Sequence, residues 1–374
     1  MTPLAAEIYR MIADEGPLPV ARYMALCLSH PVYGYYMTRD PLGARGDFVT
    51  APEVSQMFGE LIGLWAATVW RMMGAPRSVN LIELGPGRGT LMADALRAAR
   101  LVPAFRAAIR VHLVETSPVM QQRQRDTLSW LAEPPTWHTD VAQVPPKPSI
   151  VIANEFFDAL PVHQAIKGPG GWRERMVGRG DDDATLMFGL SPEPLRSLDA
   201  AWPANVRGAA DGSLFEWRSD VVVREIARRL TRDKGAALVI DYGHAESAPG
   251  ETLQAVASHG FADPLAAPGE MDLTAHVDFA ALGAAARHEG ARVSGPVTQG
   301  DFLRRLGIAE RARKLVATAT AEQASAVEAA LARLTDDRPT GMGRLFKAMA
   351  IAHPGLATLP GFEVEPMPAE CEAR

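Results

Sequence analysis

The chain has 374 residues, of which 47% are hydrophobic and 22% charged, so it can bury a sizeable core and is neither disordered nor fibrous. Its formal net charge of −6 argues against a nucleic-acid-binding protein, which needs a basic face to contact phosphates. The two cysteines, Cys27 and Cys371, lie near opposite ends of the chain, which excludes a disulfide framework and a cysteine-rich zinc site. No signal peptide or membrane anchor is expected, because charged residues interrupt the N-terminal segment and the apolar stretches are short. These features predict a protein of the bacterial cytoplasm without integral membrane contact.

The N-terminal part of the chain is predicted to be helical and rich in loops. Apolar residues recur at helical spacing in residues 4–12 and again in residues 20–28. Residues 30–53 contain many glycines and aromatic residues but show no period, so we expect an ordered loop there. A long helix is predicted over residues 56–73, with Ser55 as its N-cap.

Short apolar runs then alternate with helical segments, which predicts an α/β fold with a doubly wound, Rossmann-like parallel sheet. The four runs are residues 80–84, 110–115, 149–154 and 236–241. The last two runs are too far apart for a simple crossover, and three short strand-like segments between them predict an inserted β-meander. Residues 344–351 are expected to form a closing edge strand.

These patterns predict the following organisation. A helical segment covers residues 1–75, and an α/β core covers residues 76–353. The core carries insertions at about 160–230 and 244–343, the inserted residues forming a substrate domain. Residues 354–374 form a C-terminal tail.

The strongest motif is IELGPGRG, in which Glu83 is followed by Gly85, Gly87 and Gly89. It lies where a predicted strand meets a helix, the position at which open α/β sheets bind ligands. Glycines at this point allow a tight turn and let a ligand approach the backbone closely. The spacing is GxGxG, unlike the GxGxxG of dinucleotide-binding proteins, and the Gly-Lys-Ser/Thr of a P-loop is missing. An acidic residue before the loop suits a cationic or hydroxylated ligand better than a pyrophosphate.

A second acidic residue, Glu115, ends the next predicted strand, where a carboxylate can accept hydrogen bonds from both ribose hydroxyls. Glu83, the glycine loop and Glu115 together resemble the S-adenosylmethionine site of class I methyltransferases. A nicotinamide-binding Rossmann site remains an alternative at this point.

The third motif, NEFFDALP, directly follows the third apolar run and begins at Asn154. This position faces the transferable methyl group in a sheet of this kind. Carboxylates here could hold a cationic substrate, so we predict Glu155 and Asp158 as catalytic residues and Asn154 as a cofactor contact. A helix N-terminus whose acidic residues complement the helix dipole is the alternative.

The chain resembles the MidA family of methyltransferases, which is related to the mitochondrial complex I assembly factor. The resemblance covers nearly the whole chain and is carried by GPLPVARYMALCLSHPVYGYYMTRDPLGARGDFVTAPE, the GPGRG loop, NEFFDALP, LVIDYG, residues 251–282 and TQGDFL. It implies S-adenosyl-L-methionine as cofactor and methylation of an arginine guanidinium in a protein substrate, such as a respiratory complex I subunit. It also places the segment that contains Asp47 and Glu53 over the cofactor, which makes Asp47 a predicted cofactor contact.

Two other functions stay open from the sequence: a non-catalytic chaperone of complex assembly that kept the cofactor pocket, and a NAD-dependent oxidoreductase. Asp241 either lines the substrate side or simply ends its strand. His259, His276 and Asp278 lack the spacing of a helical metal site, so no metal is predicted. The sequence leaves the oligomeric state open.

Overall fold

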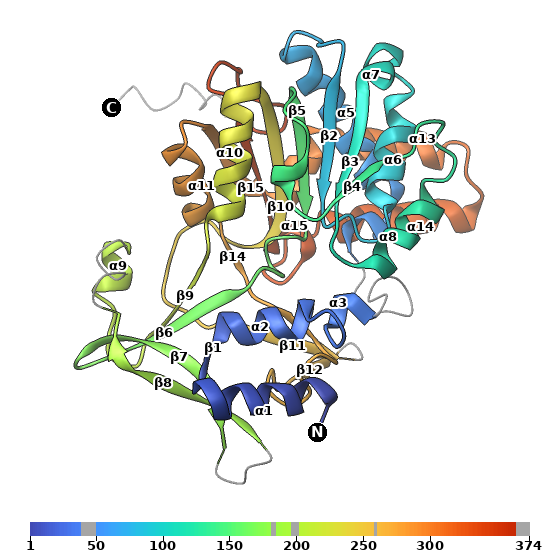
Figure 1. Ribbon diagram of the computed structural model, residues 1–374. Helices are drawn as coiled ribbons and strands as arrows, with labels where there is room; N and C mark the ends of the chain where they lie inside the picture. Colours follow the sequence, from blue (N-terminus) through green and yellow to red (C-terminus); the bar gives the residue numbers. More distant parts are fainter. Residues whose placement is uncertain (39–49, 181–184, 196–201, 258–259, 364–374) are drawn as a thin grey trace, which may run out of the picture.

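The computed structural model describes the chain except for residues 39–49, 181–184, 196–201, 258–259 and 364–374. Figure 1 shows two parts: a large sheet flanked by helices, and a second layer of N-terminal helices and smaller sheets beneath it. None of the helices in the described ranges is long and apolar enough to cross a membrane.

The main sheet has the strand order β15-β16-β10-β5-β2-β3-β4. Strands β10, β5, β2, β3 and β4 run parallel, whereas β16 and β15 are antiparallel. In sheet order the strands are Arg292–Thr298, Phe346–Ala352, Gly235–His244, Ser149–Asn154, Val79–Leu84, Ile109–Val114 and Thr136–His138, and β14 (Val277–Asp278) pairs with β10. All four predicted apolar runs are strands of this sheet, which confirms the predicted fold class.

Two expectations about the fold were wrong: one concerned the edge strand of the main sheet and the other the loop at residues 30–53. The predicted closing strand is β16, but it lies between β15 and β10, and β15 is the edge strand. The reason is burial: nearly all of β16 is buried, whereas β15 is only partly buried. The loop predicted at residues 30–53 contains two short helices, α3 (Tyr35–Thr38) and α4 (Ala51–Val54).

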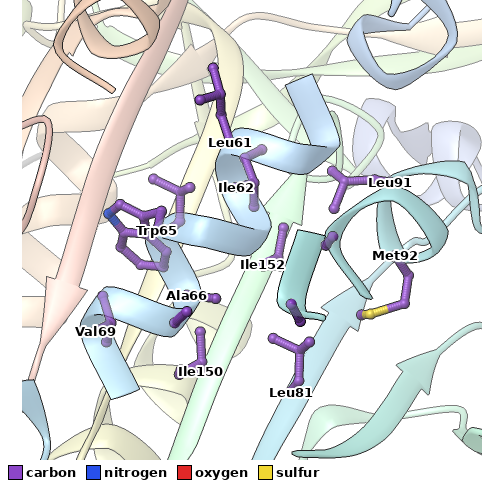
Figure 2. Packing of buried hydrophobic residues seen from close by; sticks show 14 of the residues in the cluster. Leu61, Ile62, Trp65, Ala66, Val69, Leu81, Leu91, Met92, Ile150 and Ile152 are labelled. Carbon is purple, nitrogen blue, oxygen red and sulfur yellow. The ribbon is translucent and has the colours of Figure 1, made fainter. Parts of the chain in front are cut away.

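Helices cover both faces of the sheet, because alternate residues of each strand point to opposite sides. Ile150 and Ile152 of β5 pack under α5 (Gln56–Met72) and α6 (Thr90–Ala99), as Figure 2 shows. Val151 between them belongs to the apolar cluster on the other face, which includes residues of α10 (Val221–Asp233) and α11 (Phe279–His288). The remaining described helices around the main sheet are α7 (Pro103–Ala108), α8 (Pro118–Thr127), the 3₁₀ helix Val141–Gln143, α12 (Gln299–Arg305), α13 (Ile308–Val316), α14 (Ala321–Leu334) and α15 (Met342–Leu345).

The second layer contains the predicted meander and the first helices of the chain. One sheet has the order β1-β7-β6-β9, with β8 paired to β7, and a three-stranded sheet has the order β12-β11-β13. Residues of α1, α2, β7 and β13 share one apolar core. The elements are α1 (Pro3–Glu15), α2 (Val20–Ser29), β1 (Leu18–Pro19), β6 (Val162–Gly168), β7 (Gly171–Arg179), β8 (Leu186–Pro194), α9 (Ala204–Arg207), β9 (Leu214–Arg218), β11 (Gln254–Ala257), β12 (Gly260–Ala262) and β13 (Asp272–Thr274).

The division of the chain into domains stays a prediction. Its boundaries do not follow the packing everywhere, because most of α10 falls inside the first predicted insertion, yet this helix packs on the main sheet. Likewise, α11 and β15 fall inside the second predicted insertion but complete the main sheet and its helical cover.

The helix predicted over residues 56–73 is α5, and the side chain of Ser55 accepts a hydrogen bond from Met57 N at 3.2 Å, as expected of its N-cap. Helices α5 and α6 approach each other closely at two glycines. A Cβ atom added to Gly63 would lie 2.4 Å from the carbonyl oxygen of Ala95, and one added to Gly59 would lie 2.6 Å from Cβ of Asp94. The glycines therefore allow two backbones to pack without intervening side chains.

We predict that Gly63→Ala lowers the free energy of unfolding by about 1–3 kcal/mol through overpacking, although alanine is the better helix former. Urea unfolding of the purified protein measures this change. Gly189→Ala on β8 is the control, since a Cβ atom there meets nothing within 4 Å. Equal unfolding midpoints for the two variants would contradict the close helix packing.

Candidate functional site

A cavity of about 420 Å³ lies at the carboxyl ends of β2, β3 and β5, where the main sheet meets the second layer. Parallel strands of an open α/β sheet place the residues that follow them at such an edge. The wall is made by the segments after these strands, together with α3 and β13. Glu83, Glu115 and Glu155, which belong to three separate motifs, line this one cavity.

The glycine loop forms part of the wall, and its conformation explains its composition. Gly85, Gly87 and Gly89 have φ angles of 57°, 53° and 82°, in the left-handed region that side chains disfavour. A Cβ atom on Gly85 would also lie 3.0 Å from the ring of Phe156. Gly85 and Gly87 line the cavity, whereas Gly89 is the N-cap of α6 behind it.

Two buried acceptors on neighbouring strands lack a partner within the described structure. The side chain of Glu83 is 3% exposed, and its Oε2 atom accepts no hydrogen bond; the same is true of Oδ1 of Asn154. Burial raises the pKa of Glu83 to about 8. Leaving buried polar atoms unpaired is costly, so both atoms fit a bound ligand that brings hydrogen-bond donors and positive charge.

Glu115 is held by its surroundings at the end of β3. Its Oε1 accepts from Ser117 N at 2.8 Å, and its Oε2 accepts from Nε2 of Gln124 at 3.1 Å. Gln124 also donates to the carbonyl of Gly87 at 2.7 Å and accepts from Nε1 of Trp137 at 2.8 Å. The buried Gln124 therefore ties the glycine loop to Glu115. Sequence reasoning missed it, because a glutamine in the polar helix α8 carries no distinguishing signal.

Glu155 begins the loop after β5 in a strained conformation, with a φ angle of 50°. Its Oε1 accepts from Ala51 N at 3.0 Å and from Nδ2 of Asn154 at 3.1 Å. Burial raises the pKa of Glu155 to about 7, and the hydrogen bond from Ala51 opposes that rise. The carboxyl group is thus fixed at the cavity wall and lies near the midpoint of its titration at neutral pH.

Asp241 lies beneath the same loop and does not line the cavity. Its Oδ2 accepts from the backbone N–H groups of Phe156, Phe157 and Asp158 at 3.2, 2.9 and 3.3 Å. The residue is fully buried. Of the two roles left open by the sequence, neither is the one observed: Asp241 shapes the loop that carries Glu155 and Asp158.

Asp158 reaches the cavity wall and is 6% exposed, and its Oδ1 atom has no hydrogen-bond partner in the described structure. Burial raises the pKa of this carboxyl, and the nearby positive charge of Arg218 opposes the rise. The guanidinium of Arg218 donates to the carbonyls of Asp158 at 3.3 Å and Ala275 at 2.6 Å. It therefore joins the loop to the second layer, a role with no signal in the sequence.

Other predicted residues have local roles or cannot be placed. Glu53 lines the cavity and accepts from the hydroxyl of Thr90 at 2.6 Å, whereas Asp47 lies outside the described residues. Asp278 accepts from Ala281 N as the N-cap of α11. His259 also lies outside the described residues.

Among the cavity residues that the second layer contributes, Tyr36 of α3 and Asp272 and Thr274 of β13 were missed by sequence reasoning. Tyr242, at the end of β10, completes this part of the wall. Their distance along the chain from the glycine loop hides the association in the sequence.

Comparison with known proteins gives a consistent result. Residues 61–297 match the family model of an S-adenosyl-L-methionine-dependent methyltransferase. The mitochondrial protein arginine methyltransferase NDUFAF7 homologue of Drosophila melanogaster is 38% identical over 93% of this chain and 84% of its own. The human protein arginine methyltransferase NDUFAF7 is 36% identical over 84% of this chain and 76% of its own.

A solved structure agrees with these sequence matches. The crystal structure of a protein from Burkholderia thailandensis bound to S-adenosyl-homocysteine has a TM-score of 0.84 and 30% identity, and covers 96% of this chain and 93% of its own. These findings confirm the prediction of a methyltransferase over the oxidoreductase and the non-catalytic chaperone. The chain belongs to this family and is an S-adenosyl-L-methionine-dependent methyltransferase.

Proposed function

We propose that the enzyme methylates an arginine guanidinium of a protein substrate. The observation that carries the proposal is the acidic part of the cavity wall that follows β5, where Asp158 has a buried oxygen without a partner in the described structure and Glu155 also lines the cavity. The names of the relatives from Drosophila melanogaster and human, both protein arginine methyltransferases, support the same substrate class. A respiratory complex I subunit as the substrate and a bacterial cytoplasmic location are the finer proposals that the sequence suggests.

The cofactor would be held by the residues of the main sheet. We propose that Glu83 and Asn154 receive the ammonium group, because both present buried acceptors without partners. The glycine loop at Gly85 and Gly87 would let the cofactor approach the backbone. Glu115, already oriented by Gln124, would accept the ribose hydroxyls.

The main task of the protein in this reaction is to position the guanidinium against the methyl group. S-adenosylmethionine, when bound, supplies an electrophilic methyl group on a sulfonium, so the leaving group needs no further activation. The carboxylates of Glu155 and Asp158 would align the guanidinium and draw its positive charge away from the attacking nitrogen. A carbon–sulfur bond breaks and a carbon–nitrogen bond forms. The methylated nitrogen then loses a proton, which one of these carboxylates accepts and passes to solvent.

Mass spectrometry of arginine methylation in cells with and without the gene tests the substrate class. We expect at least one methylarginine site in a protein to disappear when the gene is deleted and to return with a plasmid copy. Restoration by the plasmid of methyllysine, with no methylarginine site restored, would contradict the proposal.

We predict that the affinity for S-adenosyl-homocysteine rises by up to about tenfold per pH unit between about pH 6 and 7.5. Burial raises the pKa of Glu83 to about 8, so this carboxyl is largely protonated in the free protein and must lose its proton to bind an ammonium group. Glu83→Gln should bind more weakly at pH 7.5 and lose this pH dependence. Calorimetry at about pH 6 and about pH 7.5 measures the affinity of both proteins for S-adenosyl-homocysteine. A pH dependence of affinity that persists in Glu83→Gln would refute this role of Glu83.

For Glu155→Gln we expect the initial rate of arginine methylation to fall by about 10²-fold or more, the loss typical of one electrostatic stabiliser. Affinity for S-adenosyl-homocysteine should stay within about twofold, because the charge acts on the substrate. The rate of the parent enzyme should rise with pH through about 7, where the buried Glu155 ionises, and the variant should lack this rise. Proteins extracted from cells that lack the gene serve as methyl acceptors.

The matched control is Glu133→Gln, since the side chain of Glu133 is 76% exposed and outside the cavity wall. Its rate and pH profile should equal those of the parent enzyme. A Glu155→Gln enzyme with the parental rate would remove Glu155 from the mechanism.

A further inference from the structure

The second layer contributes an ordered set of polar side chains to the substrate end of the cavity. Tyr36, Asp272 and Thr274 come from this layer, and Tyr242 meets them from the end of β10. Asp272 and Thr274 are 4% and 3% exposed, so they are effectively withdrawn from bulk solvent. Their hydrogen bonds determine what kind of group this end of the cavity can receive.

The first pair is Tyr36 with Asp272. The phenolic oxygen of Tyr36 lies 2.8 Å from Oδ1 of Asp272, and a carboxylate can only accept, so the tyrosine hydroxyl donates. Burial and the charge of Asp272 raise the pKa of Tyr36 well above its ordinary value, so the phenol keeps its proton. Once its only hydrogen is committed to Asp272, the phenolic oxygen can act toward the cavity only as an acceptor.

The second group is Asp158 with the neighbouring Tyr242 and Thr274, which line the same end of the cavity. Burial raises the pKa of Tyr242 well above its ordinary value, so the phenol keeps its proton. Nε2 of Gln254 donates to Oγ1 of Thr274 at 3.3 Å. The Oδ1 atom of Asp158 is buried and has no hydrogen-bond partner in the described structure, so it is available as an acceptor.

The nearby cation, the guanidinium of Arg218, does not change this arrangement of acceptors. Arg218 uses its nitrogens on main-chain carbonyls, at 3.1 Å to Leu160, 2.6 Å to His276 and 2.6 Å to Ala275. The hydroxyl hydrogen of Tyr36 is committed to Asp272, and Asp158 keeps one oxygen without a partner in the described structure. Tyr36, Asp272 and Asp158 therefore present acceptors to the cavity.

We propose that Tyr36, Asp272 and Asp158 form an acceptor-rich subsite that selects the guanidinium of arginine. This inference rests on the proposed function and assigns its specificity to the second layer. A guanidinium carries five N–H donors and no acceptor, so it matches such a wall. Its planar fork can reach acceptors on separate elements at once, whereas a lysine ammonium is a point charge that cannot. A neutral urea of the same shape would set its oxygen against these acceptors.

Binding of three small probes to the protein saturated with S-adenosyl-homocysteine tests the inference. The probes are Nα-acetylarginine amide, Nα-acetyllysine amide and the neutral Nα-acetylcitrulline amide, and calorimetry measures their affinities. We expect the parent protein to bind the arginine probe at least about tenfold more tightly than either of the others.

Tyr36→Phe and Asp272→Asn should each weaken binding of the arginine probe by about tenfold, while affinity for S-adenosyl-homocysteine changes less than about twofold. The retained affinity also shows that the variant is folded; should Asp272→Asn fail to fold, the shape-preserving Tyr36→Phe decides. Tyr33→Phe is the control, because Tyr33 is 38% exposed and outside the cavity wall, and it should bind all probes as the parent does.

The outcomes separate the two proposals. Parental affinity for the arginine probe in both Tyr36→Phe and Asp272→Asn overturns this subsite but leaves arginine methylation standing. A parent protein that binds none of the probes also overturns the subsite, while the methylarginine analysis in cells still decides the function. A parent protein that binds the lysine probe as tightly as the arginine probe overturns the subsite and removes the acidic wall as support for arginine as substrate.

Discussion

The arrangement of the site depends on one buried carboxyl group, that of Asp241 in β10. Three consecutive backbone N–H groups, from Phe156 to Asp158, donate to its Oδ2 atom. Burial and the nearby acidic groups raise the pKa of Asp241 well above its ordinary value, and the donated hydrogen bonds oppose that rise. This contact turns the chain sharply after β5, so that Glu155 and Asp158 both reach the cavity wall.

The cavity wall is built from acceptors that the free protein does not satisfy. Glu83, Asn154 and Asp158 each hold a buried oxygen without a partner within the described structure, and buried unpaired polar atoms cost stability. Ligands that bring positive charge and hydrogen-bond donors relieve that cost and so stabilise the folded state. The unpaired acceptors of the free site are therefore the groups that a ligand with hydrogen-bond donors would satisfy.

The two layers of the molecule contribute different residues to this cavity. The main sheet supplies the glycine loop and Glu115 through local features of the chain, a turn and a strand end. The second layer supplies Tyr36 and Asp272, and Arg218 joins the two layers through main-chain carbonyls. Tyr36 and Asp272 can thus change without altering the glycine loop or Glu115, because these residues lie on different elements.

The amino-acid sequence alone was enough to predict the strands β2, β3, β5 and β10 and the place of the glycine loop, because apolar runs and glycine turns are local patterns. It also led to the family, which the comparisons confirm. Only the tertiary structure showed that β16 is an interior strand, that Gln124 links Glu115 to the glycine loop, and that Asp272 lines the same cavity as that loop. Those features arise from contacts between segments far apart in the chain, and such contacts leave no period or spacing in the sequence.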